Sequence, residues 1–276
     1  MTPRLWVQPR SALDGLLDLV LPRRCVVCGA PGAWLCDACE RDLRPLPDDR
    51  CGRCGAPLRR AGRLTRRARP GGTRRRLPAC RECAGRDLAF ASASAAFCYE
   101  GPARALVTAC KFRALRSLAD ELAARAAPAF SATAARVGSG ALVTAVPAHR
   151  GHRLDRGFDL AESLARRLAA GAGLTYAPLL RRVRHGARQS GLDKASRASN
   201  VQGAFALQEG AFRVGNRLKR VIIVDDVYTT GETLNQCAQA LAQAVLDPHV
   251  FTFARTVRAT PAPASRDHAV TKERCR

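Results

Sequence analysis

The sequence of 276 residues is poor in acidic residues and in lysine, and it lacks a long apolar run. No segment approaches the roughly 20 apolar residues that span a membrane, so no membrane insertion is expected. The apolar stretch 12–21 is interrupted by Asp14 and Asp18, and it has neither a cationic leader nor a small-residue cleavage site. A secretory signal is therefore not expected, and the chain is predicted to be cytoplasmic. The leucine spacing predicts a short amphipathic helix within an N-terminal segment, residues 1–24.

The scarcity of acidic side chains leaves a strong positive charge. There are 46 basic and 23 acidic residues, which gives a formal net charge of +23, and nearly all the basic residues are arginines. Such a charge favours polyanion binding, through the phosphates of nucleotides or of nucleic acid. A solvated arginine-rich surface would give the same composition, so the charge leaves both nucleic-acid contact and an ordinary surface open.

Cysteine, in contrast, is abundant and regularly spaced. Eight of the twelve cysteines form four C-x-x-C pairs: Cys25/Cys28, Cys36/Cys39, Cys51/Cys54 and Cys80/Cys83. In such a knuckle a tight turn directs two thiolates at one metal ion, so four pairs predict two structural zinc sites. Disulfides are disfavoured without a secretory signal, and a redox pair would occur once rather than four times. The spacing leaves open whether neighbouring pairs share a zinc ion or interleave as a cross-brace.

An arginine-rich insert, residues 59–76, separates the third pair from the fourth. It contains nine arginines, no acidic residue and three glycines, and it predicts a mobile segment because it cannot bury enough apolar surface to fold alone. With no aromatic side chain to stack on a base, it suits contact with nucleic-acid phosphates rather than sequence reading. A solvated loop is the alternative. The candidate phosphate contacts are Arg59, Arg60, Arg66, Arg67, Arg69, Arg74, Arg75 and Arg76.

From residue 88 onward the pattern predicts alternating strands and helices. Expected strands are 90–99, 141–147, 174–180, 217–226 and 250–257; expected helices are 104–127 with a break near Phe112, 158–170 and 232–246. This alternation predicts an α/β domain, residues 88–260, with a doubly wound parallel sheet. A small zinc-binding domain, residues 25–86, precedes it, and residues 261–276 are predicted to be a disordered tail.

Two adjacent acids, Asp225 and Asp226, follow the apolar strand that contains 221–224. In a parallel sheet they would stand at the carboxyl edge, where ligands bind. The next residues, 227–233, form a hydroxyl-rich turn around Gly231 and lead into a helix, which favours a phosphate at the exposed amides. The acids suit the vicinal hydroxyls of a sugar, directly or through Mg²⁺. The stretch therefore predicts a cradle for a ribose 5-phosphate, although an Asp-Asp pair is also common where a helix starts.

The stretch "VIIVDDVYTTGET" resembles the binding signature for 5-phosphoribosyl 1-pyrophosphate (PRPP) of type I phosphoribosyltransferases. Tyr228 departs from the signature, because many members carry an aliphatic residue there; it is expected to alter turn packing and hardly to touch the phosphate loop. The resemblance implies a PRPP site with Mg²⁺ formed by Asp225, Asp226, Val227, Tyr228, Thr229, Thr230, Gly231, Glu232 and Thr233.

Further segments resemble one branch, the ComF/GntX-type competence proteins. These are the zinc knuckles, "CKFRALRSLADELA", "VPAHRGHRLDRGFDLAESLA" and "RQSGLDKASRASNVQGAFAL". The family pattern after "RGF" is Asn-Gln, whereas Asp159 and Leu160 stand here. The resemblance implies a double zinc ribbon ahead of a parallel-sheet phosphoribosyltransferase-like domain, together with a link to DNA uptake. It supplies no acceptor substrate.

Other polar residues are candidates for the same site. Transfer from PRPP forms a cationic centre that Asp225 and Asp226 can stabilise, while the pyrophosphate needs cations. His149 and Arg150 follow the strand 141–147, and the polar segment 184–200 suits a lid with Arg188 and Lys194 as catalytic contacts. Lys111 and Arg113 either line the cleft or are ordinary surface cations. A surface role is equally open for His149, and an ordinary exposed loop is the alternative for the lid.

These features leave three hypotheses about function. The first is a phosphoribosyltransferase that moves ribose 5-phosphate onto an unknown acceptor. The second is a module that senses PRPP or a nucleotide without chemistry. The third is an adaptor that handles single-stranded DNA with the DNA-uptake machinery. Intact acids favour the first over the second, and the charge favours adding the third. The sequence does not determine the oligomeric state.

Overall fold

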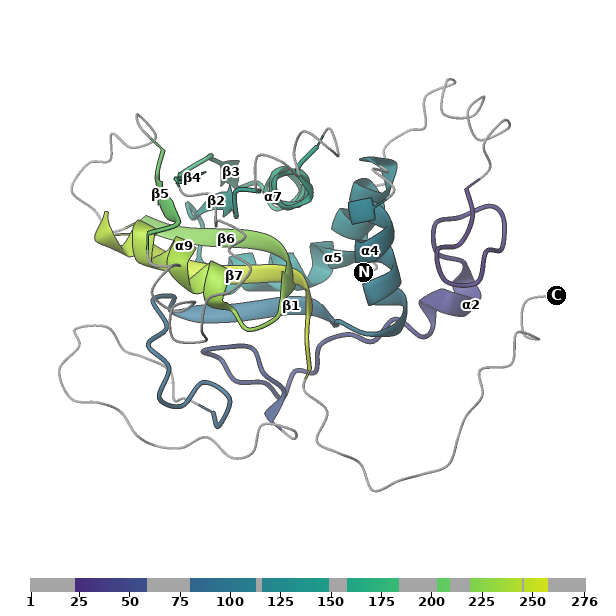
Figure 1. Ribbon diagram of the computed structural model, residues 1–276, viewed down its shortest axis with the longest axis horizontal. Coiled ribbons are helices and arrows are strands. Elements are labelled where there is room, and N and C mark those ends of the chain that lie inside the picture. The colour runs from purple at the N-terminus through teal and green to yellow at the C-terminus, as the bar shows by residue number, and fades with distance from the viewer. Residues whose placement is uncertain are drawn as a thin grey trace, which may run out of the picture.

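The fold is described from a computed structural model (Figure 1). It describes residues 23–58, 80–112, 116–148, 158–183, 203–208, 219–244 and 246–257. Within these ranges, every helix is too short or too polar to cross a membrane. The predicted N-terminal helix, the arginine-rich insert, the lid and the C-terminal tail lie outside the described residues.

A five-stranded parallel sheet forms the centre of the α/β part, in the order β1-β7-β6-β2-β3 (Figure 1). Its strands are β1 (Ser92–Cys98), β2 (Leu142–Ala145), β3 (Thr175–Tyr176), β6 (Lys219–Tyr228) and β7 (Leu246–Arg255). The apolar run 221–224 of β6 is fully buried. A strand buried on both faces belongs in the interior of a parallel sheet, and β6 has neighbours on both sides.

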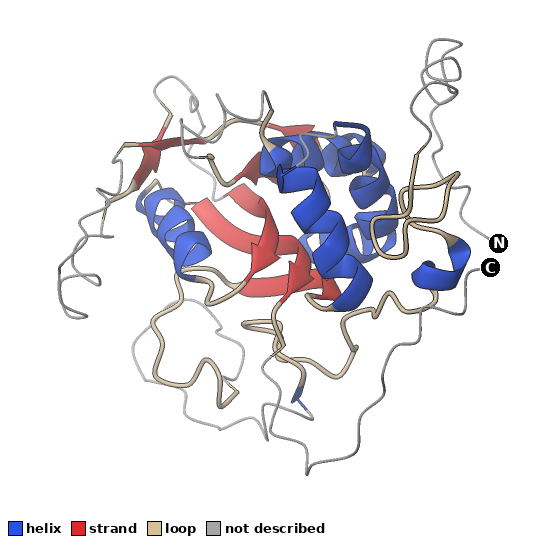
Figure 2. Ribbon diagram, turned by 45° about the vertical axis from the view of Figure 1, so that its right-hand side comes forward, coloured by secondary structure: helices blue, strands red, loops and turns tan. Residues whose placement is uncertain are grey.

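Helices cover both faces of the sheet (Figure 2). On one face lie α4 (Gly101–Phe112), α5 (Arg116–Val137) and α7 (Leu160–Gly171), which share a core with Ile222 and Val224. On the other face lies α9 (Glu232–Gln243), which shares a second core with Val221 and Ile223. Alternate β6 side chains therefore serve opposite cores, as expected for a doubly wound sheet. α4 ends at Phe112 and α5 begins at Arg116, and residues 113–115, where the predicted break would lie, are outside the described residues.

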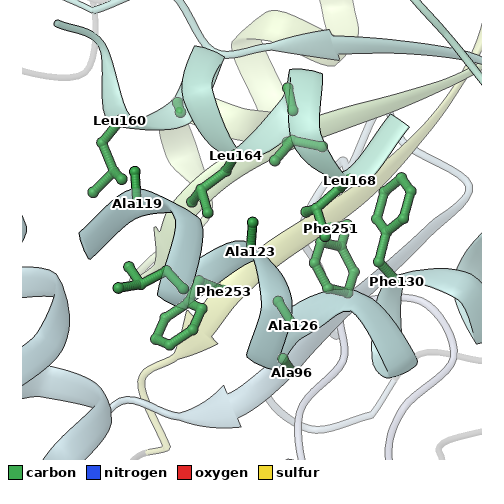
Figure 3. Packing of buried hydrophobic residues seen from close by; sticks show 14 of the residues in the cluster. Ala96, Ala119, Ala123, Ala126, Phe130, Leu160, Leu164, Leu168, Phe251 and Phe253 are labelled. Carbon is green, nitrogen blue, oxygen red and sulfur yellow. The ribbon is translucent and has the colours of Figure 1, made fainter. Parts of the chain in front are cut away.

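Small and large side chains alternate in the first core (Figure 3). The alanines Ala119, Ala123 and Ala126 on α5 are buried beside leucines of α7 and phenylalanines of β7. Phe130 packs edge-on against Phe251, with ring centroids 5.1 Å apart. The alanines let α5 approach closely, and the large side chains fill the remaining space. This packing fixes α4 and α5 relative to the end of β6, where the acids lie.

The structure corrects one predicted strand. The stretch 174–180 is not one strand: β3 stays in the parallel sheet, and β4 (Leu180–Arg182) pairs antiparallel with β5 (Phe205–Leu207). Pro178 lies between them and has no amide hydrogen for a strand ladder. The next amide, of Leu179, donates to Ala177 O at 2.9 Å and to Thr144 Oγ1 at 3.2 Å rather than to the backbone of a neighbouring strand. The chain therefore leaves the main sheet at this proline.

The two cysteine-rich segments lie on opposite faces of the sheet. The first, with the short helix α2 (Asp37–Glu40), belongs to the core of α4, α5 and α7, while the second belongs to the core of α9. Between them, residues 44–46 run antiparallel to the edge strand β1; Leu46 N donates to Ala96 O and Cys98 N to Arg44 O, each at 2.9 Å. The chain thus crosses from one face to the other along the free edge of β1.

Candidate functional site

The two acids lie near the carboxyl end of the central strand, in the last part of β6. Asp226 N donates a hydrogen bond to Asp225 Oδ1 at 2.9 Å. Burial raises the pKa of the Asp225 carboxyl well above its ordinary value, and the neighbouring charge of Asp226 raises it further. Two neighbouring, half-buried carboxylates repel each other when both are ionised, and a nearby cation or hydrogen-bond donor stabilises the ionised form. The two acids therefore favour the binding of a cation or of a hydrogen-bond donor.

Lys111 supplies a cation at this place. It lies in the last turn of α4, and its Nζ is 2.6 Å from Asp226 Oδ2. Both side chains are largely buried, at 29% and 13% exposed. Of the two alternatives that the sequence left open for Lys111, the structure favours a place beside the acids over an ordinary surface cation. Arg113 lies outside the described residues.

The turn after β6 exposes hydroxyls and helix amides at the same edge. Thr229, Thr230 and Thr233 are exposed, whereas Gly231 is buried. Gly231 precedes α9 with a φ of +78° and has no side chain to cap the helix, while Thr230 Oγ1 accepts from Glu232 N at 3.4 Å. The first amides of an α-helix have no acceptor inside the helix, so this end presents donors and a partial positive charge near the carboxyl end of β6.

Tyr228 lies directly beneath this turn. A Cβ on Gly231 would lie 2.9 Å from Tyr228 Cε1 and closer still to the hydroxyl, so only glycine fits above the ring. Tyr228 is 1% exposed and packs edge-on against Phe90. The expectation that Tyr228 hardly touches the phosphate loop is therefore wrong. The buried Tyr228 ring packs directly against Gly231, so the turn cannot move toward the core without displacing the ring.

Two arginines, which the sequence did not single out as site residues, reach the same turn. Arg86 Nη2 donates to the backbone oxygen of Thr230 at 2.6 Å. Arg255, at the end of β7, stacks over the Tyr228 ring with Cζ 4.0 Å from the centroid and pairs with Glu82. Each contact joins residues far apart in the chain, so no local pattern could have predicted it. Tyr228 and Arg255 are paired residues in the parallel ladder of β6 and β7, so the ends of these two strands lie side by side.

Asp159 has a structural position. Its Oδ1 accepts from Glu162 N at 3.2 Å and so caps α7, and its Oδ2 accepts from Ala148 N at 3.1 Å. Asp159 therefore ties the start of α7 to the segment after β2. Several predicted site residues fall outside the described residues: His149, Arg150, Arg188, Lys194 and the arginines of the insert.

The cysteines gather as two groups of four, with neighbouring pairs sharing a group. In each group the sulfur atoms lie within 4.8 Å of one another: Cys25, Cys28, Cys36 and Cys39 form the first centre, and Cys51, Cys54, Cys80 and Cys83 the second. The sequential pairing is therefore present, and the cross-brace is not.

The sulfur spacing fits zinc. A tetrahedral Zn–S bond of about 2.3 Å places sulfurs about 3.8 Å apart. Cys28 and Cys36 are 3.6 Å apart in the first centre, and Cys51 and Cys83 are 3.9 Å apart in the second. Gly29 and Gly55 follow their knuckles with φ near +80°, at 81° and 76°, and donate back to the first cysteine of each. Four thiolates leave no open position for substrate, so these centres are structural.

Comparison with known proteins gives two matches by sequence. Residues 16–84 match the family model described as "Double zinc ribbon domain". The chain is also 33% identical to Competence protein F of Haemophilus influenzae over 97 residues, which is 35% of this chain and 42% of that protein. The chain therefore carries a double zinc ribbon and is similar to a ComF-type protein over about a third of its length. The chain spans less than half the length of this curated relative, so activity and partners remain matters of proposal.

Solved structures resemble part of the chain. One is described as the allosteric regulatory enzyme of purine biosynthesis and another as glutamine PRPP amidotransferase from B. subtilis complexed with ADP and GMP. They are 24% and 25% identical, with a TM-score of 0.30 in each case, over 44% of this chain and 23% of theirs. The parallel sheet between helix layers, joined to a double zinc ribbon, confirms the predicted parallel-sheet α/β domain with a small double zinc-ribbon domain.

Proposed function

We propose that this chain binds PRPP with Mg²⁺ at the carboxyl end of β6 and transfers its ribose 5-phosphate to an acceptor. One observation carries the proposal: the half-buried acids Asp225 and Asp226 are followed within a few residues by a helix start with a glycine N-cap and exposed hydroxyls. A sugar phosphate has the matching pattern, with vicinal hydroxyls at one end and an ester phosphate at the other.

The turn receives the 5-phosphate. The amides at the start of α9 and the hydroxyls of Thr229, Thr230 and Thr233 supply hydrogen-bond donors, and the helix end favours negative charge. Gly231 has no side chain, so the backbone and the phosphate can approach closely. Arg86 adds a full positive charge beside the turn, through its bond to Thr230 O.

The acids receive the ribose hydroxyls. Carboxylate oxygens accept from the hydroxyls and are also suitable ligands for Mg²⁺, which would bring charge compensation for the pyrophosphate. Lys111 holds Asp226 in place through the ion pair at 2.6 Å. Because Lys111 is the cation nearest the pair among the described residues, it also limits repulsion between the two acids before a ligand arrives.

In the proposed reaction, the bond from the ribose C1 to pyrophosphate oxygen breaks as the acceptor's nucleophile bonds to C1. Positive charge develops on the sugar, and nearby carboxylates stabilise it electrostatically. Asp225 and Asp226 are the described residues in position for this task. Arg188, Lys194, His149 and Arg150 remain predicted contacts for the pyrophosphate side. The described residues do not identify the chemical class of the acceptor.

Calorimetry with PRPP and Mg²⁺ tests the proposal. The double variant Asp225→Asn/Asp226→Asn should lose binding, whereas Asp120→Asn should retain it. Asp120 is a suitable control because it is a half-exposed carboxylate on α5 that pairs with Arg167 and lies outside the cleft. Equal affinity of the double variant and the wild type would remove the ribose assignment. A pyrophosphate-release screen over bases and amines then separates transfer from binding alone.

A second candidate function is a non-catalytic adaptor for single-stranded DNA that uses the PRPP fold as a nucleotide sensor in DNA uptake. The net charge of +23 and the double zinc ribbon favour it. Binding to single-stranded DNA should weaken steeply with salt and fall when residues 59–76 are deleted. Salt-independent binding, or binding unchanged by the deletion, would exclude the arginine-rich insert as the contact. In either case we place the protein in the reducing cytoplasm, where thiolates remain available to zinc.

A further inference from the structure

The second zinc centre and the proposed phosphate turn are joined by two sets of contacts. Residues 80–91 contain only turns and bends, with no helix or strand, and they carry Cys80 and Cys83. Because the segment lacks regular secondary structure, a metal ion bonded to four cysteines would strongly constrain its position, together with the buried side chains of Leu88 and Phe90. Whatever this segment touches is therefore placed by the metal centre as well.

The first set of contacts passes through buried side chains. Glu82 lies between the two ligands of the fourth knuckle and pairs with Arg255. Arg255 is 1% exposed and stacks over the Tyr228 ring, and that ring fills the space beneath Gly231. Among the described residues, the Nε and Nη1 groups of Arg255 have no acceptor, so Glu82 is its principal partner. A shift of Glu82 would leave a buried guanidinium unpaired, which is costly.

The second set of contacts runs along the backbone. Arg86, three residues after Cys83, donates to Thr230 O at 2.6 Å, and its own backbone oxygen accepts from Arg53 Nη2 at 3.1 Å. Asn235, in the first turn of α9, donates to Asp87 O at 3.0 Å and accepts from Ala89 N at 2.7 Å. The segment after the fourth knuckle thus holds both the turn and the start of α9.

The first zinc centre has no such connection among the described residues. It is fixed to α5 instead, where Arg125 pairs with Glu40 beside Cys39 at 3.2 Å. Its surroundings are the core on the other face of the sheet. The molecule therefore contains an internal control, with one centre beside the turn and one remote from it.

We propose that the second zinc centre holds the turn 229–233 in its phosphate-binding shape, so that zinc at this centre and a sugar phosphate at the turn bind cooperatively. Glu82, Arg86 and Arg255 are positioning residues in this scheme, because they act on the ligand only through the turn. The choice of a sugar phosphate as the ligand rests on the proposed function. The mechanical coupling between the second zinc centre and the turn is independent of that choice. Thermodynamic coupling is reciprocal, so bound zinc and bound sugar phosphate raise each other's affinity by the same factor.

A ligand-free experiment tests the coupling alone. Alkylation of each cysteine in the presence of a chelator, resolved by peptide mass spectrometry, reports zinc loss from each centre separately. Gly231→Ala places a methyl group against Tyr228, which in turn contacts Arg255. It should speed alkylation of the second centre about tenfold and leave the first unchanged. Gly140→Ala is the matched control, since Gly140 has a φ of +84° but open space around it.

The ligand arm uses the full-length wild-type protein and Arg86→Ala. PRPP with Mg²⁺ should slow alkylation of the second centre about tenfold in the wild type, and Arg86→Ala should bind PRPP about tenfold more weakly, with Arg86→Lys restoring part of the loss. Arg125→Ala, at the first centre, should bind PRPP as the wild type does.

The outcomes separate the two proposals. If the wild type does not bind PRPP, the proposed function fails, while the Gly231→Ala experiment still decides the coupling. If Gly231→Ala leaves the second centre as slow as in the wild type, the coupling is overturned even if PRPP binds. If Gly231→Ala does not fold, the experiment with PRPP tests the coupling. PRPP that binds but leaves the alkylation rate of the second centre unchanged would also overturn the coupling.

Discussion

Lys111 Nζ lies 2.6 Å from Asp226 Oδ2, and this contact joins the end of α4 to the end of β6. It places a fixed cation beside two acids in a protein that otherwise has few lysines. Replacing Lys111 by methionine keeps most of the apolar stem and removes the charge.

Lys111→Met should weaken binding of PRPP with Mg²⁺ about tenfold, because a charge-assisted hydrogen bond contributes about 1.5–3 kcal/mol. Calorimetry measures the change. Lys219→Met, at the exposed start of β6, removes the same charge at the opposite end of the strand and should bind normally. Lys111→Met with wild-type affinity would show that the ion pair has no part in ligand binding.

Asp225 gives a prediction about stability and pH. Burial, and then Asp226, raise the pKa of the Asp225 carboxyl in the folded protein above its unfolded value of about 3.9. The folded state therefore binds this proton more tightly, and ionised Asp225 costs stability as pH rises from about 4 through the folded pKa. Asp225→Asn should be more stable than the wild type at neutral pH, and the difference should shrink toward pH 4.

Urea denaturation of both proteins at a series of pH values measures this difference. Acid also removes zinc, but both proteins carry the same cysteines, so that effect cancels in the comparison. A difference that stays constant across the series, or a less stable Asp225→Asn, would contradict the assignment of a raised pKa to Asp225.

Glycine 231 gives a prediction about packing. Gly231→Ala introduces a strained left-handed residue and a collision with Tyr228, while Gly140→Ala introduces the strain alone. The strain costs about 1–2 kcal/mol, so Gly140→Ala should lose about that much stability and Gly231→Ala clearly more. Thermal denaturation compares the two. Equal losses would mean that the Tyr228 ring moves aside freely.

The two zinc centres should differ in accessibility. The cysteines of the second centre are at most 1% exposed, whereas Cys28 in the first centre is exposed and Cys36 is half-buried. A chelator and an alkylating reagent should therefore react with the first centre well before the second, after metal analysis has found two zinc ions per chain. Simultaneous loss, or well under two zinc ions, would contradict the double-ribbon assignment.

Local patterns predicted the elements that depend on short-range rules. The apolar run before Asp225 predicted the buried strand β6, and the C-x-x-C spacing predicted both groups of cysteines. These features depend on periodicity and on ligand spacing, which can be observed within a few residues.

Contacts between distant residues could not be predicted in the same way. Arg86 meets Thr230 and Arg255 meets Glu82 across more than 140 residues, and nothing in their neighbours indicates the contact. The role of Tyr228 beneath Gly231 was misjudged because its burial depends on Phe90 and Arg255. The division of 174–180 into two strands depends on Pro178 and on the distant Thr144, whose Oγ1 accepts a hydrogen bond from the amide of Leu179.

The most direct measurement is a crystal structure of the protein with PRPP and Mg²⁺. The 5-phosphate is expected at the amides and hydroxyls of residues 229–233, with the ribose hydroxyls facing Asp225 and Asp226. A complex with the phosphate bound anywhere else would contradict the proposed site.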